Sequence, residues 1–283
     1  MNEHRLRIGD RMVTLVAGPA GWGESSPLPG YACDPLMSRR AAEEAACAGW
    51  PAPVRDVVPV NALVDDHPVD RQALAGFPAV KVKVGRADPG ADIDLVGAVR
   101  DAVGPSVALR VDANGAWDLD TAADVIERLA PYDLELVEQP VAGLGELARL
   151  RRRIAVPLAA DESVRSVDDA RRLAAWYAAD AVVVKVQALG GVRAALRVAD
   201  AAGVPAIVTS MRETSVGIAA GLALAAALPE LPYACGLAAR MPGGDVVRDP
   251  LVARQGRLHV RSVEPDPELM ARYSTASSQE VRS

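Results

Sequence analysis

The sequence predicts an α/β fold in which parallel strands close into a barrel, and two observations support this prediction. From Val57 onward, short β-branched runs alternate with helical patterns rich in Ala, Leu and Arg, which is typical of repeated strand–helix units. The ends of successive runs follow at intervals of 23 to 29 residues, enough for one strand, one helix and two loops.

The composition and charge restrict the class of protein. Half of the 283 residues are apolar, which allows one main domain of barrel size with a small appendage. The formal net charge of −6 argues against a nucleic-acid partner, because phosphate contacts need clustered Lys and Arg. The most apolar stretch, 216–228, is shorter than the roughly 20 residues that span a bilayer, so we expect a buried helix and no membrane segment. Three cysteines, which cannot all pair, and a charged amino-terminal stretch indicate a reducing cytoplasm.

Four segments are expected along the chain. They are a small amino-terminal α+β cap over 1–55, with a glycine-rich part at 18–30 and a helix at 39–47; the barrel over 56–245; a segment returning to the cap over 246–265, with strands within 251–263; and a flexible tail over 266–283.

Eight strands are predicted in the barrel, and a polar or ionisable residue closes nearly every one. The strands are 57–63, 79–84, 107–112, 134–138, 156–161, 181–186, 206–210 and 232–236. Between two of them, Asp118 or Asp120 can cap a helix over 121–129, and Pro131 marks its end. Polar strand ends favour a closed barrel, because barrel active sites gather at the carboxyl ends of the strands, whereas an open sheet concentrates its site at one switch point.

Strand alternation sends ionisable side chains into this barrel. Lys81 and Lys83 share one face of their strand, opposite the valines that would pack against helices. The same rule points further residues inward from the following strands: Arg110, Asp112, Glu138, Asp161 and Lys185. Lys83 on the second strand and Lys185 on the sixth would flank the three carboxylates from opposite sides.

The carboxylates of Asp112, Glu138 and Asp161 predict a metal site. Three carboxylates that converge in a pocket of low dielectric repel one another unless a cation neutralises them. Ligands that are all oxygen point to Mg²⁺, with Mn²⁺ as the alternative, and leave positions open for substrate oxygens.

Each of these residues alone has an ordinary structural explanation. A lone Asp at a strand end usually caps a helix, and a lone Lys is usually solvated. Together, five ionisable residues at matching depths on consecutive strands are costly for stability, so a functional site is favoured. A non-catalytic barrel that binds a ligand is the alternative from a different class.

Other positions are open to two interpretations. Lys81 either tunes the basicity of Lys83 or serves only as a salt-bridge partner. Asn114 shapes a loop or contacts a ligand. The remaining candidates for substrate contacts, or for supporting such contacts from behind, are Arg110, Ser210 and Gly236.

Several short motifs resemble those of the enolase superfamily, muconate-lactonising subgroup. They are Lys81-Val82-Lys83, Asp112-Ala113-Asn114, Glu138-Gln139-Pro140, Asp161-Glu162-Ser163, and Lys185 followed by Gly190-Gly191. Within that subgroup, the stretches 110–117, 213–217 and 231–237 are similar to the actinobacterial o-succinylbenzoate synthase family. The resemblance covers about residues 21–263.

The resemblance implies a modified (β/α)₇β barrel with an α+β cap and a Mg²⁺ held by Asp112, Glu138 and Asp161. It implies a lyase of menaquinone biosynthesis that dehydrates 2-succinyl-6-hydroxy-2,4-cyclohexadiene-1-carboxylate through a metal-stabilised enediolate. On this hypothesis Lys83 removes the proton next to the carboxylate and returns it to the leaving hydroxyl, while Lys185 stays protonated. The partner is thus a small carboxylate; the oligomeric state stays open.

The nearest alternative activity is racemisation of N-succinyl or other N-acylamino acids, which uses the same two lysines. A dipeptide epimerase is disfavoured, because that group carries paired aspartates where this chain has Ala234-Cys235-Gly236. Two features depart from the family pattern. The cap is short, and Arg212 replaces a residue that is usually apolar; Arg212 either contacts substrate or faces solvent, and we favour solvent.

Overall fold

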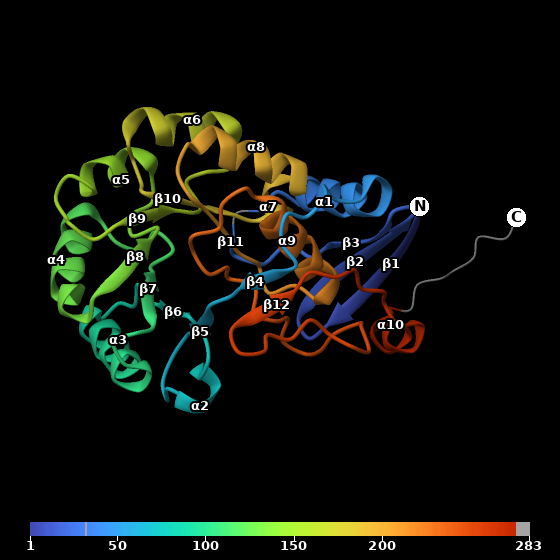
Figure 1. The fold of residues 1–283 in the computed structure, drawn as a ribbon, viewed down its shortest axis with the longest axis horizontal. Coiled ribbons are helices and arrows are strands. Elements are labelled where there is room, and N and C mark those ends of the chain that lie inside the picture. The colour runs from blue at the N-terminus through green and yellow to red at the C-terminus, as the bar shows by residue number, and fades with distance from the viewer. Residues whose placement is uncertain (32, 276–283) are drawn as a thin grey trace, which may run out of the picture.

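The computed structural model describes residues 1–31 and 33–275. A curved parallel sheet lies at its centre, with the strands in the order β11-β10-β9-β8-β7-β6-β5 (Figure 1). These strands are β5 (Ala62–Val64), β6 (Ala79–Lys83), β7 (Ala108–Asp112), β8 (Leu134–Glu138), β9 (Leu158–Ala160), β10 (Ala181–Val184) and β11 (Ala206–Val208). Neighbours in the order are also consecutive in sequence, as a barrel of repeated strand–helix units requires.

Helices connect the strands and cover the outer face of the sheet (Figure 1). They are α2 (Arg71–Leu74), α3 (Pro89–Val103), α4 (Leu119–Leu129), the 3₁₀ turn η1 (Ala130–Tyr132), α5 (Leu144–Leu150), α6 (Val167–Trp176), α7 (Val186–Leu189), α8 (Val192–Ala202) and α9 (Ser215–Ala227). Asp118, one of the two predicted caps, accepts hydrogen bonds from the backbone N–H groups of Asp120 and Thr121 at the start of α4. The predicted buried helix is α9, and no helix among the described residues is both long and apolar enough to cross a bilayer.

The segment predicted as the eighth strand closes the barrel without forming a regular strand. Val60 pairs with Cys235 on one edge of the sheet, and Thr209 pairs with Gly236 on the other, both in parallel. The Asn61 N–H donates to the Cys235 carbonyl at 2.9 Å, and the Ser210 N–H donates to the Gly236 carbonyl at 3.1 Å. The prediction of a full strand over 232–236 is therefore wrong, since only Cys235 and Gly236 pair.

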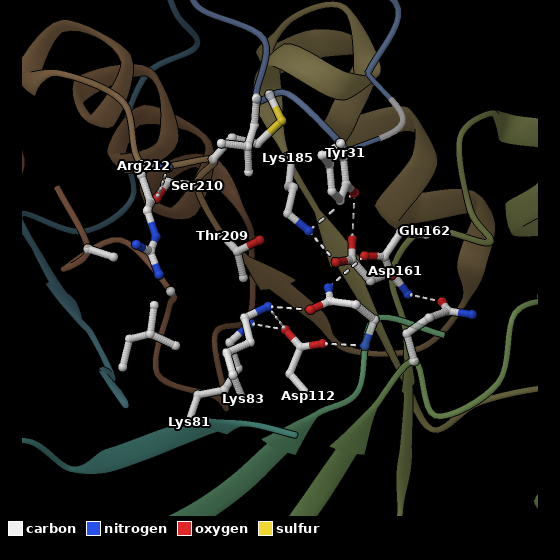
Figure 2. A pocket seen from close by; sticks show the side chains of 18 of the residues that line it. Tyr31, Lys81, Lys83, Asp112, Asp161, Glu162, Lys185, Thr209, Ser210 and Arg212 are labelled. Atoms are coloured by element: carbon white, nitrogen blue, oxygen red, sulfur yellow. Dashed lines mark hydrogen bonds and ion pairs between the residues drawn. The ribbon is translucent and has the colours of Figure 1, made fainter. Parts of the chain in front are cut away.

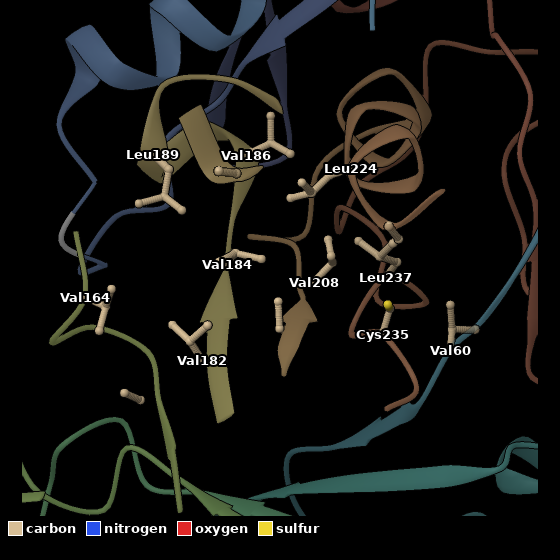
Figure 3. Close-up of a cluster of buried hydrophobic side chains, with 14 of the residues drawn as sticks. Val60, Val164, Val182, Val184, Val186, Leu189, Val208, Leu224, Cys235 and Leu237 are labelled. Atoms are coloured by element: carbon tan, nitrogen blue, oxygen red, sulfur yellow. The ribbon is translucent and has the colours of Figure 1, made fainter. Parts of the chain in front are cut away.

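Two apolar layers hold the strands, as alternation requires. Val80 and Val82 face outward and belong to the large cluster between sheet and helices. Figure 3 shows the part of that cluster in which Val184 and Val208 lie near Leu224 of α9. A smaller cluster fills the barrel interior and consists of Leu136, Ala159, Ala181, Val183 and Ile207, with Tyr233 against it. The interior is thus packed below the site rather than open.

The cap is a three-stranded antiparallel sheet with one helix. Its elements are β1 (Asn2–Ile8), β2 (Arg11–Gly18), β3 (Gly21–Ser25) and α1 (Pro35–Ala48). The glycine-rich part, 18–30, contains the β2–β3 turn, strand β3 and the loop that follows it, and the predicted helix is α1. A Cβ on Gly23 would lie 2.0 Å from the Ala42 carbonyl oxygen, so only glycine lets β3 pack this closely on α1.

The segments around the barrel differ in detail from the prediction. The single strand predicted over 57–63 is divided: β4 (Val57–Pro59) pairs antiparallel with β12 (Arg257–His259), and only β5 enters the barrel. Part of the predicted flexible tail is the helix α10 (Pro267–Tyr273), because Asp266 caps its first turn. Ser274, just after α10, pairs with Leu6 of the cap. The rest of the tail, 276–283, lies outside the described residues.

Candidate active site

A cavity of about 900 Å³ opens at the carboxyl ends of the strands, beneath the cap. Most of the predicted site residues line it: Lys81, Lys83, Asp112, Asn114, Asp161, Lys185, Ser210 and Gly236. The side chains meet here because strands β6 to β10 end at one edge of the sheet. Two predicted residues, Glu138 and Arg110, are buried but do not line the cavity.

Lysines and carboxylates pair directly on the floor of the cavity (Figure 2). The Lys81 ammonium donates to Asp112 Oδ2 at 2.8 Å and to Glu138 Oε1 at 2.9 Å. Lys83 donates to the same Asp112 oxygen at 2.7 Å and to Asn114 Oδ1 at 2.7 Å. One carboxylate oxygen of Asp112 therefore joins the two lysines of β6.

Burial and neighbouring charge shift the protonation of this group. Burial raises the pKa of Glu138 to about 8, and the negative charge of Asp112 adds to that rise. Although burial also disfavours the Asp112 carboxylate, Lys81 and Lys83 outweigh it and hold the pKa of Asp112 well below its ordinary value. Burial lowers the pKa of Lys81, but Asp112 and Glu138 more than compensate, so its pKa is raised. Lys81 is thus a cation held between the side chains of Asp112 and Glu138.

A tyrosine of the cap completes the opposite side of the cavity. The Tyr31 hydroxyl donates to Asp161 Oδ1 at 2.9 Å and accepts from the Lys185 ammonium at 3.2 Å. Lys185 also pairs with Asp161 Oδ2, and its Nζ lies 4.6 Å from the centroid of the Tyr31 ring. Burial lowers the pKa of Lys185, yet the charge of Asp161 outweighs it and keeps the pKa well above the ordinary value. Figure 2 shows Lys185 and Tyr31 facing Lys83 and Asp112.

Comparison with known proteins identifies the family. Residues 67–266 match the family described as enolase C-terminal domain-like. The o-succinylbenzoate synthase of Thermobifida fusca is 52% identical over 91% of this chain and 84% of its own. That of Mycobacterium leprae is 43% identical over 92% of this chain and 80% of its own. The chain belongs to the o-succinylbenzoate synthase family. It is therefore an enzyme of that type, as the motifs predicted.

Solved structures agree on the fold of this o-succinylbenzoate synthase family member. Muconate cycloisomerase from Pseudomonas fluorescens superposes with a TM-score of 0.82 at 24% identity, covering 96% of each chain. The muconate lactonizing enzyme of Pseudomonas putida gives the same TM-score at 23% identity, covering 96% of this chain and 98% of its own. At this identity the likeness concerns the fold alone, a barrel with a small amino-terminal domain.

Arg110 lies in the barrel interior rather than at the cavity, so of its two predicted roles the structure favours support from behind over direct substrate contact. Its guanidinium pairs with Glu135, donates to the Ala234 carbonyl at 2.7 Å and lies 5.4 Å from the centroid of the Tyr233 ring. The pairing of β7 with β8 is irregular here: Leu109 faces Leu134, but Arg110 faces Leu136. This irregularity leaves Glu135 free to meet an inward arginine.

Arg212 lines the cavity, which corrects the preference for a solvent-facing side chain. Its guanidinium pairs with Asp65, and about a third of the side chain (36%) is exposed. Its backbone has φ +58° and is fixed from the cap, because buried Arg11 donates to the carbonyls of Met211 and Arg212, both at 2.7 Å.

Three further residues of the site, Gln139, Glu162 and Tyr31, were not predicted from the sequence. Asn114 Nδ2 donates to Glu162 Oε1 at 2.8 Å, so Asn114 joins Lys83 to Glu162, and burial raises the pKa of Glu162. The side chain of Gln139 accepts from the Asp161 N–H at 2.7 Å and donates to the Val141 carbonyl at 2.7 Å, which fixes the loop after β8. Glu162 and Gln139 stand in the quoted motifs and could have been found there; Tyr31 has no such signal.

Proposed function

We propose that this protein dehydrates 2-succinyl-6-hydroxy-2,4-cyclohexadiene-1-carboxylate to o-succinylbenzoate, as a lyase of menaquinone biosynthesis in the cytoplasm. The observation that carries the proposal is the cavity in which Lys83 and Lys185 stand on opposite sides of a group of carboxylates. The names of relatives up to 52% identical support the choice of reaction. The three cysteines form no disulfide, which agrees with a reducing compartment such as the cytoplasm.

The two lysines are suited to different roles. The side chain of Lys83 is 30% exposed to the cavity, whereas that of Lys185 is only 8% exposed and held by Asp161 and Tyr31. In its neutral form Lys83 therefore takes the proton next to the substrate carboxylate, and the C–H electron pair moves into that carboxylate. The electron pair then forms the ring double bond as the C–O bond breaks. Lys83 then gives the proton to the departing hydroxyl, which leaves as water. Lys185 remains an ammonium ion and stabilises the negative charge that develops on the substrate carboxylate as its neighbouring proton is removed.

The carboxylates of Asp112, Glu138 and Asp161 fit a hard divalent cation such as Mg²⁺ or Mn²⁺ by their chemistry. They offer oxygen atoms only, and the raised pKa of Glu138 indicates that further positive charge would be favourable there. As the side chains stand, no three His, Cys, Asp or Glu groups within the described residues form a metal-binding cluster, and lysines pair with these carboxylates instead. A bound cation supplies positive charge to the substrate carboxylate as the proton leaves.

Replacement of either lysine tests these roles. With the cyclohexadiene substrate and Mg²⁺, Lys83→Ala should lower turnover about 10²- to 10⁴-fold, the usual contribution of a proton-transferring group. Lys185→Ala should lower turnover about 10²- to 10³-fold, the usual cost of removing one preorganised electrostatic group. Circular dichroism and the thermal midpoint verify that both variants are folded. Turnover close to that of the wild type in either variant excludes the role given to that lysine.

Removal of divalent cations tests the metal site by activity and by stability. Turnover should vanish in EDTA and return with Mg²⁺ or Mn²⁺. Because a ligand bound only by the folded state stabilises it, Mg²⁺ should raise the thermal midpoint of the wild type but not that of Glu138→Gln. Equal midpoints with Mg²⁺ and with EDTA in the wild type would contradict the proposal.

Racemisation of N-succinylamino acids is the second candidate, favoured by the placement of one lysine on each side of the cavity. The two activities are compared by offering the purified protein both substrates in the presence of Mg²⁺. Dehydration should exceed racemisation in kcat/KM. The opposite ranking would assign racemisation as the main activity.

A further inference from the structure

We infer that Arg212 determines specificity by binding the second, distal carboxylate of a dicarboxylate substrate. The inference rests on the proposed function, because the cyclohexadiene substrate carries one carboxylate on its ring and another at the end of the succinyl chain. The ring carboxylate of the substrate belongs beside Lys83 and the proposed cation site of the protein. The distal carboxylate needs a positively charged group elsewhere in the same cavity.

The strand order places Arg212 across the barrel mouth from the carboxylates. Asp112, Glu138 and Asp161 lie at the ends of β7, β8 and β9, the middle of the seven-stranded order. Arg212 follows β11 and pairs with Asp65, which follows β5, so this ion pair bridges the two sheet edges beside the closing segment. In a closed ring that position is opposite β8, and Figure 2 shows Arg212 and Asp161 on opposite sides of the cavity. A ligand with two anionic ends could span them.

The guanidinium of Arg212 has donors to spare. One of its nitrogens, Nη2, pairs with Asp65, and among the described residues Nη1 and Nε contact no acceptor. A guanidinium carries five N–H groups in a planar fork, so it can hold Asp65 and a ligand carboxylate together. Asp65 keeps the side chain over the cavity, and Arg11 fixes the backbone beneath it.

Most other cations of the cavity are committed elsewhere. Lys81, Lys83 and Lys185 pair with carboxylates of the floor, and Arg11 donates to three backbone carbonyls. Arg165 also has donors to spare, since within the described part of the chain only the Nε of its side chain donates, to the Glu162 carbonyl, but it follows β9 and so lies on the side of Asp161 rather than opposite it. Arg212 is also paired, but Asp65 is half exposed, and such pairs add little to stability. Its place over the cavity is better explained by a ligand.

The contribution of the distal carboxylate to binding can be measured with two product-like ligands. Calorimetry with the Mg²⁺-loaded protein compares o-succinylbenzoate with 2-butanoylbenzoate, which keeps the ring carboxylate but lacks the distal one. The wild type should bind the dicarboxylate about 10-fold more tightly, the effect of one partly exposed charge-assisted hydrogen bond. Arg212→Leu should lose this preference, and Arg212→Lys should keep part of it.

Arg165→Leu is the matched control, because it removes a cation from the opposite side of the same cavity and should leave the preference unchanged. If Arg212→Leu keeps the full preference while the wild type still dehydrates the cyclohexadiene, Arg212 is excluded and the proposed function stands. If instead the wild type fails to dehydrate, N-succinyl and N-butanoyl amino acids replace the ligand pair. Loss of the preference in Arg212→Leu then supports the inference independently, and its retention overturns it.

Discussion

Individual side chains around Lys185 show how one residue from the cap can complete a site built by the barrel. The Tyr31 hydroxyl bridges Asp161 and Lys185, while its ring covers the ammonium. Two contacts of different kinds thus restrain the same cation. Lys185 is held in place before any substrate arrives, which is what an electrostatic role requires.

Tyr31→Phe should lower kcat/KM for dehydration about 5- to 10-fold, because it removes hydrogen bonds to two charged groups and keeps the ring. Tyr31→Ala should cost more, since the cation–π contact is lost as well. Steady-state kinetics measure both effects. The control is Tyr233→Phe, which alters a ring stacked on Arg110 outside the cavity and should change kcat/KM less than about 2-fold. Equal kinetics for Tyr31→Phe and wild type would contradict the bridging role.

The polar strand ends could be located from sequence, but their partners could not. Alternation with a period of two places Lys83 and Asp112 inward whatever the rest of the chain does. Tyr31 reaches the site through the packing of the cap on the barrel, and no local pattern encodes that contact. Arg110 also alternates inward, yet it meets Glu135 because of an irregular strand pairing that leaves no signal in the residues.

At the scale of elements, barrel closure depends on a close approach at Gly236. A Cβ there would lie 2.8 Å from Thr209 Cγ2, well inside contact distance. Gly236→Ala should therefore destabilise the protein by about 1–3 kcal/mol through overpacking. Urea unfolding measures the free energy of unfolding.

The matched control is Gly145→Ala in α5, where a Cβ would meet no atom within 4 Å. A helical alanine there should stabilise the fold by about 0.5–1 kcal/mol relative to glycine. A destabilisation of the same size in both variants would show that closure at Gly236 is not the cause.

Seven of the eight predicted barrel strands are present in the sheet, with ends that differ by a few residues. Their β-branched runs alternate with helices, several of which begin at a capping Asp, Ser or Thr, and both signals are local. The eighth differs because two isolated bridges, at Cys235 and Gly236, are enough to close the ring without a regular strand. The division of 57–63 between β4 and β5 follows from a partner, β12, almost 200 residues away in sequence.

For the whole molecule, the buried carboxylate of Glu24 joins cap to barrel. It accepts from the Gly217 N–H at 3.0 Å, from the Thr214 N–H at 3.2 Å and from the Ser26 hydroxyl at 2.5 Å. Burial raises the pKa of Glu24 to about 7, from 4.5, even though the hydrogen bonds from Ser26 and Thr214 lower it. The cap is thus attached at the start of α9 by a group that titrates within the physiological range.

Stability should fall as pH rises through this range. Below pH 4.5 Glu24 is protonated in both states; between 4.5 and about 7 the unfolded chain releases the proton while the folded one retains it. Relative to Glu24→Gln, the wild type should lose on the order of 3 kcal/mol across that window. Urea unfolding of both proteins at pH 4.5, 6 and 7.5 measures the difference. A difference that is constant with pH would contradict this role.

The anchor formed by Arg11 has a consequence for the evolution of the family. Arg11 recognises the loop after β11 only through the carbonyl oxygens of Met211 and Arg212, which every amino acid possesses. Mutations can therefore replace the Arg212 side chain without removing this anchor, whereas Met211 is buried and constrained by its packing. Laboratory libraries randomised at position 212 should yield folded proteins more often than libraries randomised at Met211, so position 212 is a natural place to redirect the enzyme toward acyl chains with a different end group.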